Sequence, residues 1–443
     1  MKFLSVKHMW KGYKLVLVLI TWVIPARSFG QDIPDLSLSD AIRIGLENNF
    51  DIRVADQNIR VAENNNHIGN AGMLPRIDFS MGGTWFETQS PASFLVNRVN
   101  GTSGISLNWT IFDGYRAIAT KDRLEFLEEQ SVGNAAIIVE TTLQAIILAY
   151  YNSLIAAEQV SVLEETLGAS RRRFQYEEVR KEIGASGTFE LLQFKDALFT
   201  DSTNLAIQGL NYRNALKNLN LLINVPIETQ WNLTGRLQDN FPSYDLIELR
   251  QEMLANNANL QNQYITNHIL RQDTRLARAN MYPTIGINGN TNYGLGTVTR
   301  IDGNSSDFSA FDYSAGLTLS LNLFNGGQTR RAIRSAEINE QIGKLQERQL
   351  EEALQNDLWV AHDTYNTRRE IKDLTEELAS NAQTNLEIAE DRFESGLINS
   401  LDYRQIQLQL LQAQLSRLQA IRDLIESETE LIRLTGGLVR EEG

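Results

Sequence analysis

The sequence predicts a mainly α-helical chain of two tandem structural repeats, each carrying two strands suited to a membrane β-barrel. The first observation is a set of motifs that recur in order, so that each half is expected to form one large unit packed against its copy. The second is a pair of long windows almost free of glycine and proline. The recurring motifs are 46–49 with 254–257, Leu74-Pro75 with Tyr282-Pro283, 112–114 with 324–326, and Gly184 with Gly396, at offsets of 208, 208, 212 and 212 positions.

Residues 1–30 have the pattern of a secretory signal peptide. Four lysines precede an apolar run at 15–24, and small residues follow, with an expected cleavage after Ser28 or Gly30. Their removal takes away five basic and no acidic groups, which changes the net charge from −14 to −19. We expect an exported, acidic chain that does not bind nucleic acid. The absence of cysteine excludes disulfides, thiolate metal sites and a lipid-modified N-terminal cysteine.

The windows after each pair of expected strands favour very long helices. From Phe112 to Gly184 and from Phe324 to Gly396 the distance is 72 positions, with few glycines and many Glu, Gln, Leu and Ala. A helix of that length reaches roughly 105–110 Å at 1.5 Å per residue, which indicates a rod or a tube. The expected organisation is a first repeat at 31–225 (a helix, strands within about 76–112, a long helix at 113–183, a return helix at 188–224), a linker at 226–243, a second repeat at 244–437 (a helix, strands within about 284–324, a long helix at 325–395, a return helix at 400–436) and a tail at 438–443.

Each expected strand pair alternates apolar and small polar side chains. Leu317, Leu319, Leu321 and Leu323 alternate with Thr, Ser and Asn, and residues 105–111 repeat the pattern. Such segments of ~10 residues are typical of outer-membrane barrel strands, although a soluble sheet with one buried face has the same pattern. We expect strands at 76–85, 105–112, 284–295 and 314–324, extracellular loops at 87–104 and 296–313, and an interfacial aromatic belt formed by Trp85, Phe86, Tyr293 and Tyr313.

Four strands cannot close a barrel, and an open sheet edge in lipid leaves its backbone groups unpaired. Because single-chain bacterial barrels have at least about eight strands, the chain must share its barrel. Three copies, for example, would supply twelve strands and place their apolar faces against outer-membrane lipid. A two-stranded coiled coil or spectrin-like rod is the alternative: it accounts for the heptad spacing in the helices but not for the strands.

The doubled order of these motifs resembles the TolC-like outer membrane efflux proteins over essentially the whole mature chain. Phe50 and Ala258 replace the family's usual proline, and Asn224 stands opposite Gly436. The resemblance implies a trimer in the outer membrane of a Gram-negative bacterium, with a twelve-stranded barrel continued by an α-helical barrel through the periplasm. It would be the passive exit duct of a tripartite efflux system, with a periplasmic adaptor and an inner-membrane transporter as partners. The matching segments are 38–41, Asn48-Asn49, Leu74-Pro75, 112–114, Gly184, Gly396 and 434–436.

The resemblance also implies an adaptor-binding site at the turns of the two helix hairpins. An exposed glycine permits close backbone approach, and exposed apolar residues offer surface to bury. Glycine is also the commonest helix stop, so without the family the turns read as simple helix termination. The candidate positions are Ile183, Gly184, Ala185 and Ser186 in the first turn, and Ser395, Gly396, Leu397 and Ile398 in the second.

A periplasmic gate is the second implied site. The family closes its duct with acidic residues near the start of the last helix; Asp402 matches the first of these, Gln405 stands at the second, and Glu190 is the first-repeat equivalent. Such acids also complement a helix dipole, and both roles are compatible. Phe393 and Ile398 replace the tyrosine and arginine that lock other members. We therefore hypothesise a gate held mainly by apolar packing, which Phe393→Ala would loosen.

No catalytic site is predicted. The four histidines are scattered and none has a second ligand at metal spacing, so neither a metal nor a cofactor is expected, and the protein is not expected to be an enzyme. Two other functions remain open. One is the outer-membrane duct of a type I protein secretion system; the other, from a different class, is a secreted coiled-coil structural protein.

Overall fold

The computed structural model describes residues 33–87, 95–237, 240–300 and 303–438. The signal peptide expected at 1–30 and most of the tail expected at 438–443 lie outside these residues. In each half the same order of elements appears: two helices, two long strands and two helices. The elements are β1 (Asp35–Leu36), α1 (Leu38–Asn48), α2 (Phe50–Asn65), β2 (Arg76–Glu87), β3 (Leu95–Phe112), α3 (Arg116–Glu182), α4 (Thr188–Leu222), β4 (Asn232–Leu233), α5 (Leu246–Asn256), α6 (Ala258–Ala279), β5 (Thr284–Arg300), β6 (Ser305–Ser320), α7 (Gln328–Glu394) and α8 (Ser400–Leu434).

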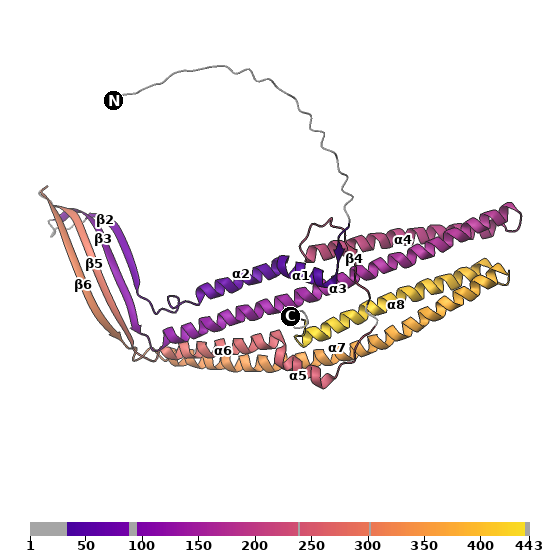
Figure 1. The fold of residues 1–443 in the computed structure, drawn as a ribbon. Coiled ribbons are helices and arrows are strands. Elements are labelled where there is room, and N and C mark those ends of the chain that lie inside the picture. Colours follow the sequence, from indigo (N-terminus) through magenta and orange to yellow (C-terminus); the bar gives the residue numbers. More distant parts are fainter. Residues whose placement is uncertain (1–32, 88–94, 238–239, 301–302, 439–443) are drawn as a thin grey trace, which may run out of the picture.

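The molecule is strongly elongated (Figure 1), with the four long strands at one end and two helix hairpins at the other. Helices α3 and α7 have 67 residues each and run along most of its length, about 100 Å at 1.5 Å per residue. Along α3, α2 covers the half near the sheet and α4 the half near the tips, while α6 and α8 do the same along α7. Each long helix therefore forms one continuous support between the sheet and the tips.

Asparagine 49 and its counterpart in the second half, Asn257, join helices at the middle of the rod. Asn49 ends α1 and begins α2, and its side-chain oxygen accepts from the Asp51 N–H at 2.8 Å. Its amide donates to the Leu222 carbonyl at the end of α4, 2.9 Å away. Asn257 does the same between α5 and α6, donating to the Leu434 carbonyl of α8 at 3.0 Å. The recurring Asn-Asn motif thus caps a helix and fastens the end of another.

The long strands form one antiparallel sheet in the order β2-β3-β5-β6. Its register places apolar side chains on one face and small polar ones on the other: Phe79, Ile105, Thr291 and Tyr313 form one row, and Asp78, Ser106, Asn290 and Ser314 the next. The apolar face is exposed in the isolated chain. Its large exposed members are Ile77, Phe79, Met81, Trp85, Val99, Ile105, Trp109, Tyr293, Leu295, Phe311, Tyr313, Leu317 and Leu319.

The strand bounds differ from those expected. Much of 87–104 and 296–313 is strand and not loop, because a ladder needs only backbone groups, which the Gly, Ser and Thr residues there still supply. β6 ends at Ser320, short of the expected 324, since its partner Thr284 follows Pro283, which has no N–H to donate. Tyr293 and Tyr313 consequently lie in the middle of their strands and not at the distal ends.

The helical part has several apolar cores. The largest unites α1, α3 and the end of α4 around Leu143, Ile146 and Tyr150. This stretch of α3 also includes an 18-residue window that is apolar enough to cross a membrane by length and composition alone. Within this chain 22% of the window is buried, and residues such as Leu143 and Ile146 pack in the core just described.

Candidate functional site at the helix-hairpin tips

Both hairpins turn through the same backbone motif. Gly184 (φ 76°) donates to the Lys181 carbonyl and Ala185 to that of Arg180; Gly396 (φ 72°) donates to the Phe393 carbonyl and Leu397 to that of Arg392. This pair of bonds, three and five residues back, is a Schellman motif, which requires a left-handed residue. A Cβ at either glycine would meet no atom within 4 Å. The glycines are thus explained by helix termination, and they alone do not indicate a binding site.

Apolar exposure at the tips is a separate observation. Ile183 is 74% exposed, Leu397 75% and Phe189, the second residue of α4, 67%. Gly184, Ala185, Ser395 and Gly396 are also exposed, whereas Ser186 and Ile398 are half-buried. Large side chains without packing partners at the end of a rod are unfavourable in water, which makes them candidates for contact with another protein.

Phe393 lies in an aromatic cluster that joins all four helices near the tips. Its ring centroid is 5.2 Å from that of Tyr403 in α8 and 6.3 Å from that of Phe194 in α4. The guanidinium of Arg173 from α3 lies over both Phe393 and Tyr403, at 5.1 and 4.7 Å from the ring centroids. Arg173 also pairs with Glu390 of α7 at 2.7 Å. The cluster is buried, and Ile398 packs against its edge.

A single chain does not bring the expected gate acids together. Asp402 is exposed in the first turn of α8, where its backbone N–H bonds the Asn399 side chain at 2.9 Å. Glu190 occupies the first turn of α4 and is half-buried. Gln405 is exposed and lines, with Asn204 and Leu408, a groove of about 640 Å³ between α4 and α8. In the described part of the chain, no group of three or more His, Cys, Asp or Glu could hold a metal ion.

The sequence analysis missed a buried ion pair between the two hairpins. Arg404 of α8 donates two hydrogen bonds to Asp201 of α4, at 2.7 and 2.9 Å, and Ser170 of α3 donates to the same carboxylate. Asp201 is fully buried. The partners are 203 positions apart, so no local pattern could reveal them. The hypothesis of mainly apolar packing therefore leaves out a strong polar contact.

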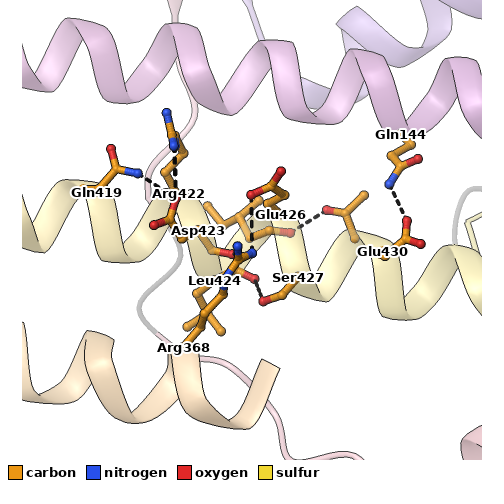
Figure 2. Close-up of polar contacts among 11 residues, drawn as sticks. Gln144, Arg368, Gln419, Arg422, Asp423, Leu424, Glu426, Ser427 and Glu430 are labelled. Carbon is orange, nitrogen blue, oxygen red and sulfur yellow. Dashed lines mark hydrogen bonds and ion pairs between the residues drawn. The ribbon is translucent and has the colours of Figure 1, made fainter. Parts of the chain in front are cut away.

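Farther from the tips, α8 is fixed on both sides (Figure 2). Arg368 of α7 donates to the Asp423 carbonyl at 2.6 Å and to the Glu426 carboxylate at 3.3 Å. On the opposite side, Gln144 of α3 donates to Glu430 at 2.8 Å. Near the middle of the rod, the second hairpin is therefore held by hydrogen bonds from Arg368 and Gln144. At its tip, it is held to the first hairpin by Arg404 and the aromatic cluster.

A sheet that gathers its large apolar side chains on one exposed face, joined to long helices with exposed apolar tips, defines a class of membrane-embedded proteins that extend far beyond the lipid. The sequence model of the outer membrane efflux proteins matches residues 41–225 and again 249–437. The chain belongs to this family. It is located in the outer membrane with its helices in the periplasm, and it serves as the exit duct of an efflux system. Because the members of this family are ducts, the chain's membership excludes the alternative of a secreted coiled-coil structural protein.

Individual relatives and a solved structure support the same family assignment. The cation efflux system protein CusC of Escherichia coli O157:H7 is 21% identical over 393 residues, covering 83% of this chain and 79% of CusC. The alkaline protease secretion protein AprF of Pseudomonas aeruginosa is 24% identical over 336 residues, covering 72% of this chain and 68% of AprF. The crystal structure of the Campylobacter jejuni CmeC outer membrane channel superimposes with a TM-score of 0.76 at 18% identity, covering 91% and 89% of the two chains.

Proposed function

We propose that three copies of this chain assemble around one axis, and that their sheets close into a twelve-stranded barrel. The observation that carries this is the sheet itself: among the described residues, β2 and β6 each pair along one edge only, while the outer face carries the large apolar side chains. Unpaired edges in lipid cost several kcal/mol per backbone group, so the edges must meet further strands. The duplicated order of elements supports two tandem repeats per chain, which would surround the axis with six similar units.

In this assembly the helices continue the barrel as a duct. The tips would then be the part farthest from the membrane, where a periplasmic adaptor would bury Ile183 and Leu397 and an inner-membrane transporter would supply the energy. Leu397→Ser is expected to abolish efflux-dependent antibiotic resistance while single-channel conductance stays normal. Ile247→Ser, at an equally exposed residue on α5 (71%), is the control and leaves resistance unchanged. Loss of resistance in both variants, or in neither, would refute the tip assignment.

The gate is proposed at the same end. Three Asp402 carboxylates around one axis would attract cations and make further ionisation harder. Gln405 lies one turn farther along the same helix α8, and Glu190 lies in the first turn of α4. Phe393 would act indirectly, by holding Tyr403 and with it the start of α8. The Arg404–Asp201 pair holds the same segment against the first hairpin.

Single-channel conductance of the detergent-extracted protein in a planar bilayer, with the oligomer mass measured alongside, tests the proposal. We expect a trimer with small, cation-selective currents, and a loss of cation selectivity in Asp402→Ala. A monomer, or a protein that never conducts, would overturn the assembly. A conducting trimer whose cation selectivity is unchanged in Asp402→Ala would overturn the proposed gate but not the proposed assembly.

A second candidate is the duct of a type I protein secretion system, which the similarity to AprF supports. Deleting the gene in the source bacterium separates the two. Increased sensitivity to small antibiotics with unchanged secreted proteins indicates efflux, whereas loss of a secreted protein with unchanged sensitivity indicates secretion.

A further inference from the structure

A pocket of about 680 Å³ lies where the chain leaves β6 and enters α7. One wall is apolar and is formed by Met281, Leu323 and Phe324. The other is charged and is formed by Arg330, Arg334 and Glu337 of the first turns of α7. The pocket thus combines two chemistries at the boundary between the sheet and the helical part, a place that neither the gate nor the tips involve.

The apolar wall continues the outer face of the sheet. Leu317 and Leu319 point from that face, and Leu323 extends the same alternation beyond the end of β6. Leu323 is 88% exposed and Phe324 86%, the most exposed large apolar residues of the described chain. A lipid acyl chain lying against the sheet could therefore extend onto this wall.

The charged wall is positive in an acidic protein. Glu337 accepts from Arg278 at 2.9 Å and from Arg334 at 3.5 Å. The hydrogen bond from Arg278 is the main reason that the pKa of Glu337 is lowered, so this carboxylate stays ionised. Arg330 has no hydrogen-bond or ion-pair partner among the described residues. Within this wall, two guanidinium groups against one carboxylate leave one positive charge, and Arg278 beside the pocket adds another, in a chain whose net charge is −14.

We propose that this pocket binds a glycerophospholipid of the membrane leaflet nearest the helices. Its phosphate would lie between Arg330 and Arg334, because guanidinium groups bind phosphate oxygens in pairs. One acyl chain would cover Leu323 and Phe324. A free phosphate would leave these two side chains exposed, and an apolar segment of a second copy would leave the charge of Arg330 uncompensated. The proposal rests on the membrane orientation of the sheet given above.

Native mass spectrometry of the full-length, detergent-extracted protein with added dioleoylphosphatidylglycerol tests this. Arg330→Gln is expected to weaken lipid binding about tenfold, the effect of losing a charge-assisted hydrogen bond. Leu323→Ser should weaken it as well. Arg331→Gln is the matched control, since Arg331 is equally exposed and adjacent in sequence but does not line the pocket. Arg330→Lys, which keeps the charge, should fall between the wild type and Arg330→Gln.

Three results would overturn the proposal. Equal lipid binding by Arg330→Gln and Arg331→Gln would show that the pocket does not select the phosphate. Competition by millimolar inorganic phosphate with no effect of Leu323→Ser would indicate a free anion site. An intact conducting trimer that binds no phosphatidylglycerol would indicate that a neighbouring copy covers the pocket. Failure of the proposed assembly is separately visible, because oligomer mass and conductance would be lost in the wild type.

Discussion

At the scale of single residues, the asparagines at the middle of the rod explain why the two halves share a motif. Asn257 is 1% exposed, and its side chain both starts α6 and bonds the end of α8. The local backbone also explains why the turn after α4 has Asn224 where the second half has Gly436. Asn224 takes the left-handed conformation (φ 53°), as Gly436 does (φ 70°), and its amide bonds the Asn48 carbonyl at 3.0 Å. Asparagine tolerates that conformation better than most residues, so the departure from the family pattern preserves the turn.

Asn257→Ala is expected to destabilise the protein by about 1–2 kcal/mol, the usual effect of losing a helix N-cap. Thermal unfolding of the extracted protein, followed by circular dichroism, measures this. Asn385→Ala is the control, because Asn385 is exposed in the interior of α7, in its last third, and alanine is the better helix former. Equal melting temperatures for Asn257→Ala and wild type would contradict the capping role.

Glu140 gives a prediction about pH. It is 6% exposed, and burial raises its pKa despite the attraction of Arg433. A glutamate whose folded pKa is raised loses its proton more easily in the unfolded chain, so stability falls as pH rises through the ordinary glutamate range. Glu140→Gln should therefore raise the melting temperature at pH 7 and leave it unchanged at pH 4. Glu370→Gln, at an exposed site, should have no effect at either pH. A lower melting temperature of Glu140→Gln at pH 7 would mean that attraction to Arg433 dominates.

At the scale of elements, α8 is attached to its neighbours by different means along its length. Near the middle of the rod it bonds both long helices through Arg368 and Gln144. Near the tip, the connection to the first hairpin depends on Arg404, Asp201 and the aromatic cluster. A movement of the tip of the second hairpin away from the first would therefore have to break the Arg404–Asp201 pair and the aromatic contacts.

Asp201→Asn should destabilise the protein by about 3–5 kcal/mol, since it leaves the Arg404 charge without its partner in a buried site. Adding Arg404→Met should recover much of the loss, because the charge is then absent. Thermal unfolding measures both, and we expect higher single-channel conductance in Asp201→Asn. Asp40→Asn, in the exposed pair with Arg43, should change stability by under ~1 kcal/mol. Similar losses of stability in the Asp40 and Asp201 variants would show that the Arg404–Asp201 pair contributes no more than an exposed ion pair.

At the scale of the whole molecule, the two faces of the sheet decide how the protein sits in the membrane. Leu317→Lys places a charge on the apolar face, three residues from the helix-side end of β6. It is expected to cost about 1–2 kcal/mol, because the cost of about 2–4 kcal/mol at the bilayer midplane falls toward the interface. Thr318→Lys, one residue along, places the same charge on the polar face and should be tolerated. Recovery of trimer from the outer-membrane fraction measures the difference. Equal recovery of the two variants would contradict the assignment of the faces.

The sequence by itself determined the long helices, the glycine turns and the alternating strands, because each depends on residues close together in the chain. It did not determine where the strands end. Helix caps and alternation are local signals, whereas the length of a ladder depends on which backbone groups find partners on another strand, as Ser320 and Thr284 illustrate.

Only the tertiary structure decided which of the many charged residues are buried and paired. Asp201 and an exposed aspartate look alike in the sequence, since the burial of Asp201 comes from helices that meet only after folding. The same holds for the pocket at Arg330, whose apolar wall and charged wall come from three segments. Local chemistry thus specifies the elements of this protein, and their packing specifies the sites.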